Sequence, residues 1–189
     1  PVLTNVVISG NWSGNIGGGV FNNSSSPILT NVTISGNGNT FGLGGIYDIN
    51  SSIPVIRNSI IYDEYIPIND YDAGSSEVVS YSLIENSTVT ADGNISTISP
   101  MFVNERSQND APFTDGDYHL QPGSPVTNKG NNVYFAVGQT PDLHLITTDL
   151  DGNPRIYNGA VDLGAYENQI TVLPVALVKF TVKAENNTA

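Results

Sequence analysis

Several carboxylates lie close together in the first half of the chain, and paired carboxylates are the groups that hydrolyse glycosidic bonds. They are Asp48, Asp63, Glu64, Asp70 and Asp72. A glycosidase needs two or three such groups about 5 to 9 Å apart. Asp63, Asp70 and Asp72 form the candidate catalytic set, because Asp70 and Asp72 would share one face of a strand. The same oxygens could hold calcium. We favour the simpler interpretation, a solvated acidic loop.

A second acidic motif, Asp149, Asp151 and Asn153, has the spacing that begins a calcium-binding loop. The bidentate glutamate expected at the twelfth position is missing, since an alanine stands there. We therefore expect no cofactor, with calcium as the open alternative. The two histidines, His119 and His144, lack metal-ligand spacing and are interpreted as surface or packing residues.

Aromatic side chains offer a binding surface in place of a catalytic one. Phe21 and Tyr47 occupy equivalent positions and should point outward, beside the inward Val20 and Ile46, with Trp12 on the adjacent corner. Such a stripe is a platform for sugar rings or for a neighbouring protein surface. Another part of the parent protein covering the stripe is the alternative.

A repeat must position all of these side chains. Residues 27–37, P-I-L-T-N-V-T-I-S-G-N, nearly duplicate residues 1–11, P-V-L-T-N-V-V-I-S-G-N, at an offset of 26 (27 minus 1). A weaker third copy, P-V-I-R-N-S-I-I-Y-D, begins 27 residues later at Pro54 (54 minus 27). A fixed period in this range indicates a repeat architecture.

Within a copy, alternating apolar residues predict short strands, and the Asn-, Ser- and Gly-rich corners between them predict turns. Three short strands per repeat have no core of their own unless each pairs in parallel with its counterpart in the next coil, about 4.8 Å away. Val6 should then lie over Val32, and Ile8 over Ile34 and Ile61. We predict an all-β parallel β-helix of about five coils with a C-terminal cap.

The asparagine of each T-N-V or R-N-S corner is the most informative residue of the repeat. Asn5, Asn31 and Asn58 fall where the alternation breaks. Asparagine tolerates the left-handed backbone of a sharp corner, and its amide can bond to the same amide in the next coil. The pattern predicts an asparagine ladder, although asparagine is also a common turn residue.

The amino-acid composition narrows the classes of molecule that the chain is expected to bind. The formal net charge is −12, with six Lys plus Arg against eighteen Asp plus Glu. This balance disfavours nucleic acid, anionic membranes and polyuronates, which all need cations on the protein. No apolar run approaches the length that spans a membrane, so we expect no membrane insertion. Arg57 is the only basic residue inside the recognisable repeat, which makes a polysaccharide lyase a poor hypothesis.

The pattern divides the chain into three parts. We assign residues 1–128 to the coils, irregular from residue 63, with a further coil through Ile95, Ile98 and Phe102. Residues 129–168 are assigned to the cap that covers the last layer. Residues 169–189, with the apolar run L-P-V-A-L-V-K-F-T-V, are a linker and edge strand or the start of a truncated following domain. Because the chain begins in the middle of a repeat, we expect it to be a piece of a longer polypeptide.

These residues carry a family resemblance. The repeats, together with G-G-G-V-F-N-N-S-S-S-P, resemble those of bacterial secreted proteins with a right-handed parallel β-helix of the pectin-lyase-like type. The motifs L-Q-P-G-S-P-V-T-N-K-G, D-L-D-G-N-P-R-I and V-D-L-G-A-Y-E are similar to the end of that helix in large surface proteins with a choice-of-anchor domain. The tail is similar to the junction before the sorting domain of Bacteroidota-type proteins. The resemblance also assigns Arg155 to a structural cap, paired with a nearby carboxylate.

The resemblance implies secretion and a cell-surface location, but no particular reaction, because β-helices of this type include enzymes, adhesins and stalks. We therefore expect a non-catalytic extracellular structural or adhesive module. Its partners would be other segments of the parent protein, neighbouring subunits or surface glycans. The alternatives are a polysaccharide-active enzyme, glycosidase or lyase, and a self-assembling filament subunit.

Overall fold

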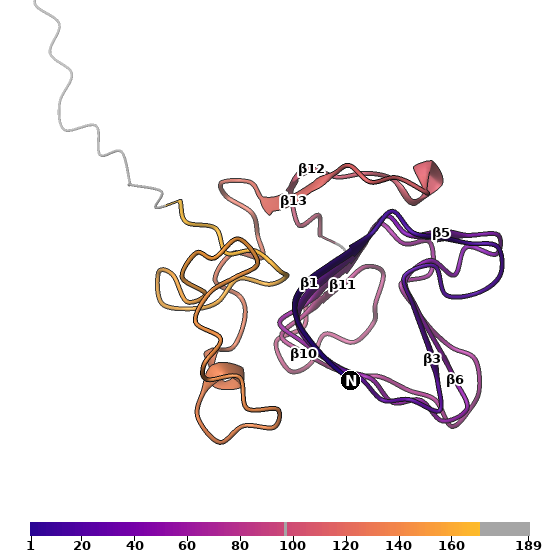
Figure 1. Cartoon of the computed structure of the whole chain (residues 1–189), viewed down its shortest axis with the longest axis horizontal. Coiled ribbons are helices and arrows are strands. Elements are labelled where there is room, and N and C mark those ends of the chain that lie inside the picture. The colour runs from indigo at the N-terminus through magenta and orange to yellow at the C-terminus, as the bar shows by residue number, and fades with distance from the viewer. Residues whose placement is uncertain (97, 171–189) are drawn as a thin grey trace, which may run out of the picture.

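The computed structural model describes residues 1–96 and 98–170. Its first half is a parallel β-solenoid of about three turns, seen end-on in Figure 1, so the predicted fold class is confirmed. Three parallel sheets form its sides. The strands of the first turn are β1 (Val2–Ser9), β2 (Trp12–Ser13) and β3 (Val20–Asn23), and those of the second are β4 (Ile28–Ser35), β5 (Gly38–Asn39) and β6 (Ile46–Ile49). The third turn holds β7 (Val55–Arg57), β8 (Ile60–Tyr62) and β9 (Ile68–Asp70).

The register confirms the repeat. Val6 pairs with Val32, and Ile8 pairs with Ile34, which pairs in turn with Ile61. Because equivalent residues stack, their side chains form a continuous aliphatic column inside the solenoid. Its buried members are Leu29, Val32, Ile34, Ile46, Ile56, Ile61 and Ile84.

The solenoid is shorter than the five coils that the sequence predicted. Two short strands, β10 (Val78–Ser80) and β11 (Leu83–Ile84), extend the first sheet, and Ile95 adds only an isolated bridge to Leu83. Phe102 begins no further coil: β12 (Phe102–Asn104) pairs antiparallel with β13 (Asp117–Leu120). Once the 26-residue register is lost, the chain has no stacking partner to continue the helix and turns back on itself.

Residues 124–168 lie along the side of the solenoid, where we had expected a cap over its last layer (Figure 1, orange to yellow). They cover apolar side chains that the β1–β4–β8–β11 sheet directs outward, including Val7, Ile60 and Leu83. A second core results, with Phe102, Tyr118, Leu120, Val126 and Leu163 on its other side. The proposed boundaries at 128 and 168 stay predictions, and the apolar tail Leu173–Val182 lies outside the described residues.

The loop between β12 and β13 forms an arm, residues 105–116, that reaches back over one corner of the first two turns. It carries a short 3-10 helix, η1 (Gln108–Asp110). A second, η2 (Asn132–Phe135), lies in residues 124–168, which we call the lateral segment. Phe113 donates its backbone N–H to Gly10 O at 3.0 Å. Among the described residues, neither helix is long enough to cross a membrane.

Candidate functional site

The three predicted ladder asparagines all have left-handed backbones, with φ of 54° at Asn5, 54° at Asn31 and 48° at Asn58. The corner role is therefore confirmed. Only one rung joins them among the described residues, from Asn58 Nδ2 to Asn31 Oδ1 at 3.3 Å. Asn31 and Asn58 are buried and Asn5 is half-buried, but most of their amide bonds leave the solenoid.

The outward bonds hold the lateral segment. Asn5 donates to Thr148 O at 2.7 Å, and Asn31 donates to the backbone carbonyls of Asp162 and Gly164 at 2.9 and 3.1 Å. Asn58 exchanges two bonds with the backbone of a single residue, accepting from its N–H at 2.8 Å and donating to its carbonyl at 3.1 Å; that residue is Asn131. One asparagine per turn thus fastens residues 131–164 to the side of the solenoid.

A longer ladder lies at another corner, which the sequence analysis missed. Asn11 Nδ2 donates to Asn37 Oδ1 at 2.9 Å, and Asn37 Nδ2 donates to Glu64 Oε1 at 3.0 Å. Asn11 and Asn37 are separated by the 26-residue period, so the repeat already contained this signal. Glu64 takes the next position because a carboxylate oxygen accepts the same amide bond.

The candidate catalytic carboxylates Asp63, Asp70 and Asp72 are each bound by different neighbours. Asp63 accepts from the N–H of Gln108 at 3.0 Å and so supports the arm. Asp72 accepts from the backbone of Asn50 and, at 3.0 Å, from that of Gly74, closing a turn. Asp70 ends β9 beside Asp48 in the register. Among the described residues, no hydrogen bond joins any two of the three, so they form no acid–base pair with one another.

Burial makes several of these acids weak. It raises the pKa of Asp48 to about 6 and that of Glu64 to about 8. Burial, together with the neighbouring Glu77 carboxylate, raises the pKa of Asp70 to about 7. Glu64 Oε2 and Asp48 Oδ2 have no hydrogen-bond partner among residues 1–96 and 98–170. A protonated carboxyl loses less on burial than a carboxylate, so the buried side chains of Asp48 and Glu64 are mostly neutral in mildly acidic solution, whereas Asp70 lies at the exposed end of β9.

The candidate calcium loop uses its oxygens internally. Asp149 Oδ1 accepts from the backbone N–H groups of Asp151 and Asn153 at 3.0 and 2.8 Å. Asp151 Oδ2 lies 2.6 Å from His119 Nε2, so this histidine packs in a polar contact between chain segments. Within residues 1–96 and 98–170, no three His, Cys, Asp or Glu side chains are grouped as a metal site requires. Arg155 does pair with a carboxylate, Glu167, at 3.0 Å in the interior.

The structure separates the three predicted aromatic residues. Phe21 and Tyr47 stack with ring centroids 6.0 Å apart, and Tyr71 extends the stack at 5.8 Å from Tyr47. Tyr47 is only 3% exposed, because its neighbours cover both faces. Trp12 has no ring contact with this stack among the described residues and lies at the β2–β5 corner instead.

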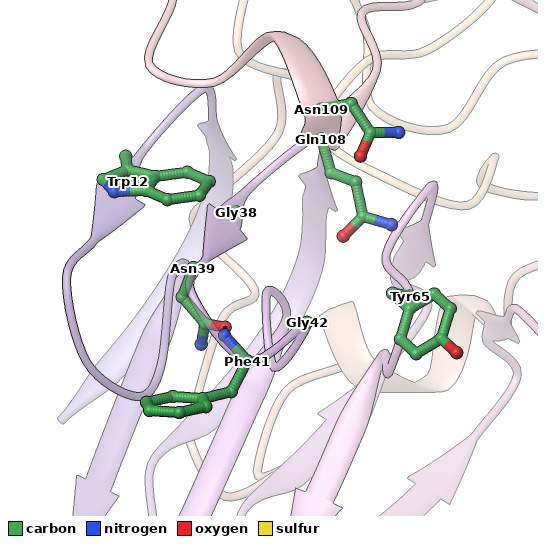
Figure 2. A pocket seen from close by; sticks show the side chains of 8 residues that line it. All are labelled: Trp12, Gly38, Asn39, Phe41, Gly42, Tyr65, Gln108 and Asn109. Carbon is green, nitrogen blue, oxygen red and sulfur yellow. Dashed lines mark hydrogen bonds between the residues drawn. The ribbon is translucent and has the colours of Figure 1, made fainter.

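Trp12 belongs to a groove of about 410 Å³ at that corner. The side chains around it are those of Trp12, Asn39, Phe41, Tyr65, Gln108 and Asn109, with Gly38 and Gly42 in its floor (Figure 2). Three of its walls are aromatic rings that are 49%, 62% and 74% exposed, those of Trp12, Phe41 and Tyr65. The repeat carries no signal for Phe41 and Tyr65, because Phe41 follows Asn37 by four residues whereas Tyr65 follows Glu64, the next member of the ladder, by one.

The arm forms the remaining wall. Glycines at the corner leave room for it: a Cβ at Gly36 would lie 2.8 Å from the ring of Phe113, and one at Gly38 would lie 2.8 Å from Gln108 O. Asp63 holds Gln108 by accepting its backbone N–H, and the side-chain amide of Gln108 has no hydrogen-bond partner in the described part of the chain. Figure 2 shows this side chain reaching from the arm into the groove.

The exposed aromatic rings and side-chain amides of the groove are groups suited to binding a ligand. None of its lining residues carries a charge, and histidine, cysteine and serine are absent from the lining. In comparisons with known proteins, no family model, curated protein or solved structure matches this chain.

Proposed function

We propose that this chain is a non-catalytic extracellular module that serves as a stiff structural and adhesive part of a secreted or cell-surface protein. The observation that carries the proposal is the hydrogen bonding of the candidate catalytic carboxylates. Asp63 accepts one backbone N–H bond and Asp72 accepts several, and no hydrogen bond joins Asp70 to either of them among the described residues. A glycosidase needs two carboxylates free to face one bond.

The solenoid is stiffened by its hydrogen bonds to the lateral segment. The lateral segment is bonded to all three turns, so a turn cannot move away from its neighbours without also breaking these bonds. Such a rod presents its corners at fixed spacing, which suits adhesion and contacts with other segments of a parent protein.

The finer family assignment belongs to this proposal as well. The motifs P-G-S-P and G-A-Y-E support a bacterial, Bacteroidota-type origin and a pectin-lyase-like, choice-of-anchor surface protein. An extracellular location is compatible with the absence of cysteine, because stacking and the lateral segment supply the core without disulfides.

The test combines a search for products with a search for retention. Purified protein is incubated with a panel of neutral and acidic polysaccharides, and reducing ends and unsaturated sugars are measured in solution while bound protein is measured on the insoluble fraction. We expect retention on at least one polysaccharide and no product. Product formation that disappears in the Asp70→Asn/Asp72→Asn variant would overturn the proposal in favour of an enzyme. Particle size that rises with concentration, without retention, would favour a filament subunit.

A further inference from the structure

We propose that the groove bounded by Trp12, Phe41, Tyr65 and Gln108 binds a neutral glycan chain. This inference rests on the adhesive function proposed above and supplies its ligand class. It also moves the binding surface away from the Phe21–Tyr47 stack, whose central ring is almost fully covered.

The first support is the spacing of the rings. Trp12 belongs to the first turn, Phe41 to the second and Tyr65 to the third. The N–H of Ile66, directly after Tyr65, donates to the carbonyl of Gly42, directly after Phe41, at 3.1 Å. In the parallel sheets of this solenoid an N–H bonds to the residue before its register partner, as Val20 N does to Gly45 O while Val20 pairs with Ile46. Tyr65 is therefore level with Gly42, the residue after Phe41, in adjacent turns whose backbones lie about 4.8 Å apart. The rings are distributed along the solenoid axis, as an extended ligand requires.

The second support is the exposure of the rings. Side chains that stabilise a core are covered, whereas Phe41 and Tyr65 are 62% and 74% exposed although both are large and apolar. An aromatic face can pack on the C–H face of a sugar ring while the hydroxyl groups of the sugar stay in water. Clustered exposed rings around one depression indicate a binding site rather than chance exposure.

The third support is the chemistry of the polar groups. Gln108 and Asn109 each provide an amide, which both donates and accepts hydrogen bonds, and so does a sugar hydroxyl. Asn39 is already used internally, with its oxygen accepting from Phe41 N and Leu43 N. It therefore shapes the groove floor. The side-chain amide of Gln108 has no partner among the residues that the structure describes, so it is the amide placed to contact a ligand.

Charge selects a neutral ligand. The lining carries no cation that could pair with a uronate, sulfate or phosphate. The chain as a whole carries a formal charge of −12, which repels anionic polymers. Proline-rich peptides also bind aromatic grooves. They are tested below as the competing ligand, because ring stacking alone does not separate them from sugars.

The experiment uses Trp12 as its own reporter, since it is the only tryptophan of the chain. The emission of the protein is titrated with neutral hexasaccharides of glucose, mannose, xylose and N-acetylglucosamine, with a galacturonate hexasaccharide, and with a proline-rich decapeptide. We expect at least one neutral hexasaccharide to shift the emission to shorter wavelength with a dissociation constant on the order of 0.1 to 1 mM, as a shallow groove allows.

Two groove variants and one matched control decide where binding occurs. Tyr65→Ala and Gln108→Ala should each weaken binding about tenfold or more, since each removes a separate contact. Gln108→Ala keeps the backbone bond to Asp63, and a thermal unfolding curve checks that each variant is folded. Phe21→Ala removes another exposed aromatic ring, 48% exposed against 74% for Tyr65, from the Phe21–Tyr47 stack and should leave binding unchanged.

Each outcome has a defined consequence. The inference is overturned if no neutral hexasaccharide changes the emission at millimolar concentration, if only galacturonate or the peptide does, or if Phe21→Ala weakens binding while Tyr65→Ala does not. Retention on a polysaccharide in the previous test, without a tryptophan response here, would leave the adhesive function standing and place it elsewhere. A tryptophan response together with released sugars would keep the groove and reject the non-catalytic function.

Discussion

Single asparagines have two physical roles in this chain. The left-handed corner of each turn needs a residue that tolerates positive φ, and the side chain at that corner is then directed away from the core. An amide in this position can bond to whatever covers the sheet. Asn31 does so twice, to Asp162 O and Gly164 O.

Substitution of Asn31 should therefore lower the free energy of unfolding more than its position in a turn alone suggests. Asn31→Gly keeps the left-handed backbone and loses the amide bonds, and we expect it to lower the free energy of unfolding by about 1–3 kcal/mol. Asn31→Ala loses the same bonds and also places an alanine at positive φ, so it should cost about 1–2 kcal/mol more. Urea unfolding of the three proteins measures both differences. Equal stability of Asn31→Gly and the parent would show that the bonds contribute nothing.

Glu64 connects stability to pH. Its pKa of about 8 in the folded protein lies above that of an exposed glutamate, so between these two values the folded state binds more protons than the unfolded state. Stability from this group is therefore present at low pH and is lost as pH rises toward 8. Asp48, Asp70 and Glu105, with pKa values raised mainly by burial to about 6, 7 and 7, act in the same direction.

We expect the thermal midpoint to be higher at pH 5.5 than at pH 8.5. Glu64→Gln keeps an acceptor for Asn37 and removes the titration, so it should flatten this dependence and stabilise the protein at pH 8.5 by about 1–2 kcal/mol. Glu77→Gln, at a carboxylate that lies near Asp70, provides a comparison outside the ladder. A parent protein whose midpoint rises steadily from pH 5.5 to pH 8.5 would contradict this account.

At the scale of elements, the arm and the solenoid corner fit because glycines stand between them. Gly36 has a φ of +68°, and a Cβ there would lie 2.5 Å from Arg106 O and 2.8 Å from the ring of Phe113. Gly152 shares the positive φ, at +87°, but has open space around its Cα. Comparing alanine substitutions at Gly36 and Gly152 therefore separates the cost of backbone strain from the cost of displacing the arm.

Gly152→Ala should cost about 1 kcal/mol, the strain of a left-handed alanine. Gly36→Ala should cost clearly more, about 2–4 kcal/mol, because it adds a collision that the arm must relieve. It should also change the emission of Trp12, since displacement of the arm opens the groove. The hypothesis of arm docking fails if the two variants lose equal stability and their emission spectra match.

The elements that could be predicted are those governed by the repeat. Parallel strands, the column through Ile34 and the corners at Asn5, Asn31 and Asn58 followed from alternation and a fixed offset. The antiparallel pairing of β12 with β13 has no periodic signal, so Phe102 was placed in a coil that does not form. The groove depends on that arm, which is why only Trp12 of its lining was proposed beforehand.

At the scale of the whole molecule, the position of the lateral segment was also missed, although a signal for it existed. Val7 and Ile60 occupy the outward position at which Thr33 stands in the second turn, and an apolar side chain there needs a cover. Composition alone did not say whether residues 129–168 cover an end or a side. The structure places them against the side and buries Arg155 beside Glu167 within them.

The lateral segment should unfold together with the solenoid. Arg155→Met leaves the Glu167 carboxylate buried and without its cation, and we expect a loss of about 3–5 kcal/mol in the free energy of unfolding. Arg155→Met combined with Glu167→Leu removes both charges and should recover a large part of that loss. Circular dichroism of the sheet and tyrosine fluorescence should show one transition at the same urea concentration. Two separate transitions would mean that the segment and the solenoid are independent.

The central claim is that residues 124–168 lie along the side of a three-turn solenoid, and engineered cross-linking tests it most directly. The chain has no cysteine, so the pair Thr33→Cys with Ala165→Cys introduces the only thiols. In the structure Ala165 N donates to Thr33 Oγ1 at 3.1 Å. Strand β3, to which Phe21 belongs, forms a different side of the solenoid from β1 (Figure 1). Under mild oxidation we predict a rapid intramolecular disulfide, identified by peptide mass spectrometry, for this pair and none for Phe21→Cys with Ala165→Cys. Equal rates for the two pairs would contradict the lateral arrangement.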